Sequence, residues 1–266
     1  MRINRPDEPA YTGGPTFRKV PLALSADELT GADVVIVGAP MDDMVTNRPG
    51  TRFGPREIRV AYEGGGDPEG WHMDLGVDPF VALKVVDRGD ASVRPADAYA
   101  SHRAIRAAVS EVVTARAVPI VLGGDHSIAF PDISAVAEGL PHGSLAVVQF
   151  DTHTDTGTQN WGVEWAHGTP FRHLVDRGVI PGPRLVQVGI RGYWPNPEEF
   201  AWARDAGVRW HRMESVVERG IDAVVDGVVE EIADADHLFL SIDIDVLDPA
   251  FAPGTGTPEP GGMTTR

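Results

Sequence analysis

The sequence predicts an α/β protein in which helices cover both faces of a central, mainly parallel sheet. Two observations predict this class: short apolar runs recur along the chain, and helical segments lie between them. The runs are rich in Val, Ile and Leu, end in Gly or polar clusters, and cover residues 33–40, 119–127, 145–155, 184–192 and 238–248. Their nearly continuous hydrophobicity is typical of strands that are covered on both sides.

The clearest of the helical segments is residues 95–117, which are Ala-rich and have a proline near their start. Its apolar residues recur at helical spacing and predict one buried face, formed by Ala104, Ile105, Ala108, Val109 and Val112. Residues 198–206 and 222–233 have similar character. Strands and helices in this alternating order favour right-handed crossovers in a parallel sheet. The Gly- and Pro-rich residues 46–55 and 63–78 are predicted to be surface loops.

Length and composition predict a single domain over residues 1–266. No stretch of the 266 residues reads as a linker, and 42% hydrophobic with 23% charged residues is ordinary for a globular protein. The formal net charge of -16 argues against nucleic acid or an anionic membrane as a partner. The same charge would attract a small cation.

The chain contains no cysteine, which excludes disulfides, thiolate nucleophiles and cysteine-ligated metal sites. Any metal must therefore take oxygen and imidazole ligands. Residues 1–7 are polar and include a proline, and no apolar run approaches transmembrane length. We therefore expect a cytoplasmic protein.

Metal-type ligands follow three of the predicted strands. Ligands bind beyond the carboxyl ends of the strands in open parallel sheets, so the residues that close each run are informative. The runs lead into Gly123-Gly124-Asp125-His126-Ser127, Asp151-Thr152-His153-Thr154-Asp155 and Ser241-Ile242-Asp243-Ile244-Asp245. Residues two apart share one face of an extended segment, which would align Asp151, His153 and Asp155, and likewise Asp243 and Asp245, with Ile244 facing the core.

The four carboxylates of this group cannot all stay ionised at close quarters without compensation. Two divalent cations would cancel four negative charges, and oxygen-rich ligands with some imidazole suit Mn²⁺. Zinc, nickel and iron remain open from the ligand types. Each short motif by itself is more often a structural pair or a turn, but six donors at three strand ends favour a metal site.

These motifs, together with Ala252-Pro253-Gly254-Thr255-Gly256-Thr257-Pro258, resemble the signatures of the ureohydrolase family of arginases and agmatinases. The segments 48–55 and 167–171 also resemble family segments, so the similarity runs from roughly residue 15 to the last residue. The resemblance implies an α/β/α sandwich around a mainly parallel sheet of about eight strands. It also implies a homotrimer or homohexamer.

The resemblance further implies two Mn²⁺ ions, one bound by His126, Asp151, Asp155 and Asp243, and one by His153, Asp151, Asp243 and Asp245. The implied reaction is hydrolysis of a guanidino compound with release of urea. Asp155 would accept a proton from water and pass it to the departing amine. His167 matches a family histidine that shuttles protons, and a structural role in capping a loop is the alternative.

Substrate choice is expected to depend on residues 156–166, whose polar and aromatic candidates are Gln159, Asn160, Trp161, Glu164 and Trp165. The two tryptophans would stack on a cation or close over an aliphatic chain, or they would pack against a neighbouring subunit. The long form of the last motif looks more like agmatinase than arginase, which favours agmatine. Guanidinobutyrate, guanidinopropionate and guanidine remain open as substrates. Thr152 replaces the commoner alanine of its motif.

The chain is expected to be C-terminally incomplete as a ureohydrolase domain. It stops at Arg266 after a strand and a loop, where an α/β protein would continue into a covering helix. The family's C-terminal glutamate that grips the guanidinium cannot be identified. A truncated, non-catalytic homologue with an assembly or regulatory role is therefore the alternative from another class, and a deacetylase of related fold is a second enzymatic alternative.

Overall fold

The computed structural model of the chain describes residues 14–61 and 70–266. The N-terminal residues 1–7 and most of the first half of the predicted loop 63–78 lie outside these ranges. The chain divides into two compact units, one of Met1–Asp43 with Gly50–Asp125, the other of Met44–Pro49 with His126–Arg266. Within the described ranges, no helix is long and apolar enough to cross a bilayer. The single-domain expectation stays a prediction.

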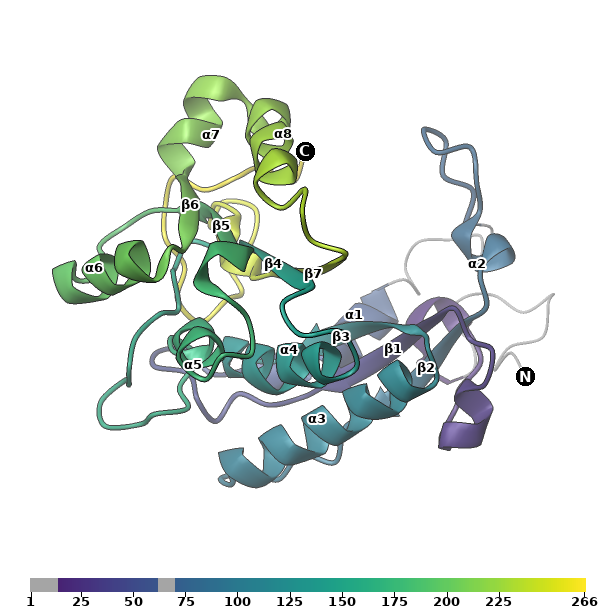
Figure 1. Ribbon diagram of the computed structural model, residues 1–266. Coiled ribbons are helices and arrows are strands. Elements are labelled where there is room, and N and C mark those ends of the chain that lie inside the picture. The colour runs from purple at the N-terminus through teal and green to yellow at the C-terminus, as the bar shows by residue number, and fades with distance from the viewer. Residues whose placement is uncertain (1–13, 62–69) are drawn as a thin grey trace. The chain divides into compact units, whose positions relative to one another are not determined.

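The first unit contains a parallel sheet in the order β2-β1-β3 (Figure 1). Its strands are β1 (Val34–Ala39), β2 (Val85–Asp90) and β3 (Val118–Gly123), and its helices are α1 (Gly54–Ala61), α2 (Pro79–Ala82) and α3 (Ala98–Thr114). The Asp97 side chain caps α3 by accepting from the Ala100 amide. Val112 of α3 packs with Val35 and Val37 of β1, which places this helix on one face of the sheet.

The second unit contains a parallel sheet in the order β6-β5-β4-β7. Its strands are β4 (Leu145–Phe150), β5 (Leu185–Ile190), β6 (Arg209–Arg212) and β7 (His237–Ile242). Its helices are α4 (Ala129–Glu138), α5 (Pro170–Asp176), α6 (Pro197–Ala206), α7 (Met213–Arg219) and α8 (Ile221–Glu231).

Alternate side chains of β4 point into two separate cores of the second unit. Val147 packs with Ile133 of α4 and Leu174 of α5, and Ala203 of α6 belongs to the same cluster. Val148 packs on the opposite face with residues of α7 and α8. The second unit is therefore a helix, sheet, helix sandwich, and the carboxyl ends of strands β4 and β7 lead into the predicted ligands.

The predicted α/β class and the parallel pairing are confirmed. The described strands number seven and form two sheets of three and four strands, whereas the resemblance implied one sheet of about eight. Coverage is also uneven, because Leu238, Leu240 and Ile242 of β7 are 56%, 51% and 64% exposed on one face. In the predicted loop 46–55, a 3-10 helix forms at Thr51–Phe53 and α1 begins at Gly54.

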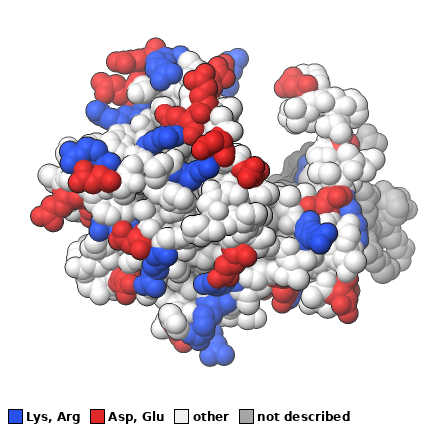
Figure 2. Space-filling view, in the orientation of Figure 1, with Lys and Arg blue, Asp and Glu red and all other residues white. Residues whose placement is uncertain are grey.

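The visible surface carries acidic and basic side chains interspersed with one another (Figure 2). No continuous basic patch gathers on this face among the described residues.

Candidate metal centre

The six predicted ligands come from three segments of the chain, which follow strands β3, β4 and β7. His126 opens the 3-10 helix His126–Ile128, Asp151 follows β4, and Asp243 follows β7. The sequence analysis assumed that the chain stays extended beyond these strand ends, so that residues two apart share one face. The chain is not extended there. Asp155 has a φ of 49°, in the left-handed region that Asp tolerates. The side chains therefore meet through turns and not through the period of a strand.

Ile244 was expected to face the core, and this expectation is wrong. It lies in the 3-10 helix Ile244–Val246 and its side chain is 51% exposed. The Asp243 side chain accepts a hydrogen bond from the Asp245 amide at 2.9 Å, which caps this helix. The turn keeps both carboxylates on the ligand side while it directs Ile244 outward.

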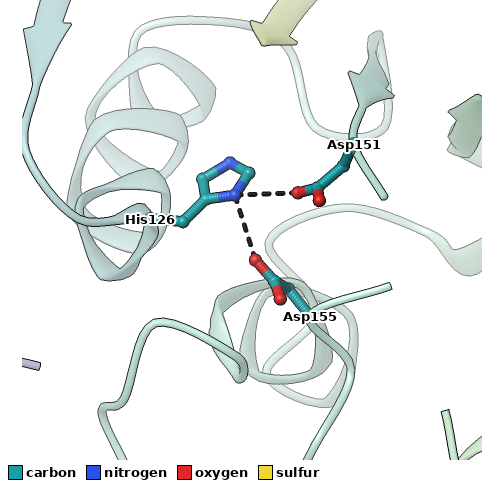
Figure 3. Close-up of side chains that lie close together, drawn as sticks. All are labelled: His126, Asp151 and Asp155. Carbon is teal, nitrogen blue, oxygen red and sulfur yellow. Dashed lines mark ion pairs between the residues drawn. The ribbon is translucent and has the colours of Figure 1, made fainter. Parts of the chain in front are cut away.

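The first donor group is formed by His126, Asp151 and Asp155. Nδ1 of His126 lies 3.0 Å from Asp151 Oδ2 and 3.0 Å from Asp155 Oδ2 (Figure 3). A third carboxylate oxygen, Oδ2 of Asp243, lies 3.2 Å from the same nitrogen. Three acidic side chains therefore converge on one atom of the imidazole.

The second donor group is formed by Asp151, His153 and Asp245. Nδ1 of His153 lies 3.1 Å from Asp245 Oδ2 and 3.7 Å from Asp151 Oδ1. Asp151 thus offers one carboxylate oxygen to each group. Each group contains three of the four ligands that the resemblance implies for one ion, with Asp151 in both, whereas Asp243, implied as a ligand of both ions, belongs to neither group.

Burial and crowding shift the protonation of these side chains. Burial raises the pKa of Asp151, and the neighbouring charges of Asp155 and Asp243 raise it further. Burial also raises the pKa of Asp155. It raises the pKa of Asp245 to about 8, together with the charges of Asp151 and Asp243. The cluster of carboxylates therefore retains protons unless a cation enters it.

The two imidazoles and Asp243 are shifted toward their charged forms. Burial opposes the charge on His153, but the hydrogen bond to Asp245 and the charge of Asp151 outweigh it and raise its pKa to about 9. Burial likewise opposes ionisation of Asp243, but the close approach and the charge of the His126 imidazole lower its pKa to about 2. Without metal, imidazolium charge is the compensation that the cluster contains.

The geometry fits divalent cations better than it fits hydrogen bonds. Nδ1 of His126 is buried and has no hydrogen-bond partner of acceptable geometry in the described part of the chain, despite its three close oxygens. Nε2 of the ring lies 2.9 Å from Ser241 Oγ, and a tautomer that donates from Nε2 leaves the Nδ1 lone pair facing the carboxylates. No lysine or arginine among the described residues forms an ion pair with the four acidic side chains.

A buried amide relay orients the shared ligand Asp151. Gln187 of β5 donates from Nε2 to Gln149 Oε1 at 2.6 Å, and Gln149 of β4 donates from Nε2 to Asp151 Oδ2 at 2.7 Å. Both glutamines are fully buried. Sequence analysis did not single them out, although a Gln at the middle of each of two apolar strands is a signal that something polar lies nearby.

The guanidinium of Arg191 holds the segment that carries Asp245. It donates to the backbone carbonyl oxygens of Asp245, Val246 and Glu259 at 2.8, 3.2 and 2.6 Å. Burial lowers the pKa of Arg191. Thr152 contributes from the other side, because its amide donates to Asp245 Oδ1 at 3.2 Å.

A cavity of roughly 170 Å³ adjoins the donor groups, and His153 and Asp155 are part of its wall. The predicted proton shuttle His167 also lines it, with Nε2 lying 2.7 Å from Thr46 Oγ1 and accepting from the Thr46 amide at 3.2 Å. The remaining wall residues are Thr46, Thr154, Thr156, Gly157, Asn160, Trp161, Gly168, Trp194, Glu199 and Thr257.

Two of the five predicted substrate-loop residues, Asn160 and Trp161, line this cavity, and the other three do not. Glu164 pairs with Arg177 at 3.0 Å. Trp165 packs against Phe130 with the ring centroids 4.8 Å apart and the ring planes tilted by 50°. Gln159 is exposed and is not a wall residue. Position next to a ligand motif does not determine which loop side chains turn inward.

Wall residues from other segments were not predicted. Thr46 lies far upstream, while Trp194 and Glu199 come from the segment that enters α6. No local motif marks them, because they reach the cavity only through the fold. The one pattern that could have indicated this segment is the helix-start sequence Trp194-Pro195-Asn196-Pro197, which precedes two glutamates.

Comparison with known proteins agrees with this geometry. The family model described as arginase family matches residues 32–266. Proclavaminate amidinohydrolase of Streptomyces clavuligerus is 40% identical over 100% of this chain and 82% of its own length. Its structure gives a TM-score of 0.87 at 39% identity, covering 97% of this chain and 82% of that chain.

Two further relatives differ from it in their named activities. The mitochondrial agmatinase of Gallus gallus is 39% identical over 99% of this chain and 76% of its own length. The guanidinopropionase of Pseudomonas aeruginosa is 39% identical over 97% of this chain and 78% of its own length. The donor geometry, the family match and these identities lead to one conclusion: the chain belongs to the arginase family.

Proposed function

We propose that this chain, an amidinohydrolase of the arginase family, hydrolyses agmatine to putrescine and urea with two Mn²⁺ ions. The observation that carries the proposal is the pair of donor groups that share Asp151 and adjoin a cavity. A non-catalytic homologue would have no need to keep both groups intact beside a cavity.

His126, Asp151 and Asp155 would hold one ion, and His153, Asp151 and Asp245 the other. Asp243, which lies 3.2 Å from the His126 ring, would complete both sets as a second shared ligand. Oxygen-rich sites with imidazole suit Mn²⁺. When bound, two such ions supply the positive charge that lowers the pKa of water toward neutrality.

Asp155 is the general base and acid of the proposed reaction. It accepts a proton from the attacking water and passes it to the amine nitrogen as the bond between that nitrogen and the guanidinium carbon breaks. Water thus adds to the carbon, and the diamine and urea leave.

His167 is proposed to move protons between the cavity and solvent. Its imidazole lines the cavity and is oriented by Thr46. Imidazole exchanges protons near neutral pH, which suits this role. In the structural alternative, His167 only holds Thr46 in place by hydrogen bonds. Replacement of the ring would then lower the stability of the protein and leave proton transfer unchanged.

The cavity wall favours agmatine over the guanidino acids. No lysine or arginine belongs to the wall within the described ranges, whereas Asp155 and Glu199 do. The carboxylate of guanidinobutyrate or guanidinopropionate would enter without a cationic partner, which is costly in a partly closed cavity. The terminal ammonium of agmatine would meet acidic and aromatic groups instead.

The test is a urea assay of Mn²⁺-loaded protein against agmatine, guanidinobutyrate, guanidinopropionate, arginine and guanidine, with metal content measured in parallel. We expect agmatine to give the highest kcat/KM. Urea from none of these compounds at full metal occupancy would refute the proposed activity and favour a non-catalytic role. The homotrimeric or homohexameric assembly and the cytoplasmic location stay predictions.

A further inference from the structure

The wall of the cavity next to the donor groups contains one carboxylate that is not a proposed metal ligand, that of Glu199. Glu199 belongs to the first turn of α6, and its side chain is half-buried. The Asn196 side chain accepts from the amides of Glu198 and Glu199, which fixes the start of the helix. The Glu199 position is therefore set by a capped helix and not by a free loop.

The Glu199 carboxylate is directed toward the chain that follows Asp155. Its Oε1 lies 3.5 Å from the point that a Cβ at Gly157 would occupy, so it borders the segment that carries the proposed base. Burial raises the pKa of Glu199 and the negative charge of Asp155 acts in the same direction, while hydrogen bonds from Asn196 and the charge of Arg172 oppose the rise in part. The carboxylate thus lacks a full complement of positive charge.

No cationic side chain in the described chain pairs with Glu199. Arg172 is the basic residue whose charge acts on it, but its guanidinium is bonded to Asp176 and lies 4.1 Å from the centre of the Trp202 ring. Arg172 is also absent from the cavity wall. The Glu199 carboxylate therefore accepts hydrogen bonds from Asn196 but has no cationic partner among the described residues, and a cation that enters the cavity would supply one.

Asn160 supplies a second acceptor in the same cavity. Its Oδ1 is buried and has no hydrogen-bond partner among the described residues. The same atom lies 2.9 Å from the point that a Cβ at Gly168 would occupy, so the amide is packed against another wall residue. A buried carbonyl oxygen without a donor is costly, and rotation of the Asn160 side chain toward a ligand with N–H groups would remove that cost.

Two tryptophans complete the surroundings of these acceptors. Trp161 and Trp194 both belong to the cavity wall and are 85% and 61% exposed. Indole faces attract cations, and an ammonium carries three donors and no acceptor. The wall therefore combines a carboxylate, an unpartnered carbonyl oxygen and two indoles, which is the chemistry of an ammonium subsite.

We propose that Glu199 is a specificity-determining residue that binds the terminal ammonium of the substrate, with Asn160 as the second acceptor. The inference rests on the proposed hydrolysis of guanidino compounds and assigns the selection among them to a named side chain. It predicts discrimination by tail charge: ammonium is preferred, an uncharged tail is tolerated, and a carboxylate is repelled.

The test is Glu199→Gln, which keeps the size of the side chain and removes its charge. The substrates are agmatine, butylguanidine and 4-guanidinobutyrate, which differ mainly in tail charge. A hydrogen bond to a charged group contributes enough to predict a fall in kcat/KM for agmatine of roughly 10- to 100-fold, mainly through KM. The value for butylguanidine stays within about twofold, because its tail makes no such bond.

The matched control is Glu198→Gln, one residue earlier on the same helix turn, exposed and outside the cavity wall. It should leave all three substrates unchanged. A readout without turnover is putrescine binding by calorimetry, which should weaken about tenfold or more in Glu199→Gln only. Circular dichroism and manganese content establish that each variant is folded and loaded.

An equal loss for agmatine and butylguanidine in a folded, loaded Glu199→Gln protein would overturn the subsite and leave a structural role. An unchanged preference for agmatine would overturn it as well. These outcomes differ from failure of the proposed function itself, in which the unaltered protein releases no urea from any of the three compounds.

Discussion

Two clusters of aspartates in this protein are compensated in different ways. In the first unit, Arg59 of α1 donates from Nε and Nη2 to both oxygens of Asp87 at 2.8 and 2.9 Å, and from Nη1 to Asp90 at 2.5 Å. Arg59 is 6% exposed and Asp87 is fully buried. The charges of this cluster are balanced by a side chain of the same fold, so it is structural.

The donor groups of the second unit contain more acidic side chains and no such guanidinium among the described residues. In the described part of the chain, the imidazoles of His126 and His153 are the side chains of potential positive charge that pair with these carboxylates, which belong to Asp151, Asp155, Asp243 and Asp245. A buried carboxylate therefore does not identify a functional site by itself. The identity of its compensating charge does, and a cluster that the fold leaves uncompensated is the one that requires a ligand.

Removal of metal is the change that should distinguish the donor groups most strongly from the Arg59 cluster. Chelation should reduce urea release to background, because neither water activation nor the charge balance of the second unit survives it, and added Mn²⁺ should restore it. The same chelator saturated with Mn²⁺ beforehand is the control. Undiminished activity in a sample verified as metal-free would remove the mechanism.

The next largest effect is expected for Asp155→Asn. Loss of a positioned acid and base that is also a metal ligand should lower kcat by about a thousandfold or more. Asp234→Asn, which alters an 80% exposed carboxylate paired with Arg184, is the matched control and should leave kcat unchanged. Turnover near that of the unaltered protein with full metal occupancy would refute the role given to Asp155.

Arg59→Met should lower the free energy of unfolding and leave the catalysed reaction unchanged. Removal of one partner of a buried pair leaves Asp87 uncompensated, which typically costs about 3–5 kcal/mol of unfolding free energy. Arg204→Met removes an exposed partner of Asp205 and should cost less than about 1 kcal/mol. Denaturant unfolding measures both, and equal costs for the two variants would contradict the structural role of Arg59.

The smallest effect is the pH dependence that His153 confers. Its pKa of about 9 in metal-free protein lies above the ordinary value, so the protonated ring stabilises that state below about pH 6.5 and the contribution is lost as pH rises through about 9. A metal requires the neutral ring, so Mn²⁺ affinity should rise with pH over this window.

Calorimetric titrations with Mn²⁺ between about pH 6 and 8 test this linkage, with proton release measured in buffers of different ionisation enthalpy. His142→Gln, which alters an exposed histidine outside both donor groups, should keep the slope. An affinity for Mn²⁺ that is independent of pH would show that no proton is displaced from the donor groups.

Sequence alone predicted the strands whose interiors are continuously apolar, and it missed the others for a physical reason. β2 is interrupted by Asp87, Arg88 and Asp90, and β6 reads Arg-Trp-His-Arg. Polar side chains at these positions are satisfied by partners elsewhere, as Asp87 is by Arg59. Such partnerships connect residues far apart in sequence and leave no local pattern.

The donor residues could be proposed from sequence because three strand ends together carry six of them, one after the first strand, three after the second and two after the third. Their exact arrangement could not, since turns after β4 and β7 replace the extended segments that spacing alone would give. The relay from Gln187 through Gln149 to Asp151 and the cavity position of Glu199 depend on how strands and helices pack. Packing of this kind cannot be read from one sequence.

The most direct test of the central claim is anomalous diffraction at the manganese edge from crystals of Mn²⁺-loaded protein. Two peaks are predicted, one bounded by His126, Asp151 and Asp155, and the other by Asp151, His153 and Asp245. Absence of peaks at these residues in metal-loaded crystals, or peaks elsewhere only, would contradict the account.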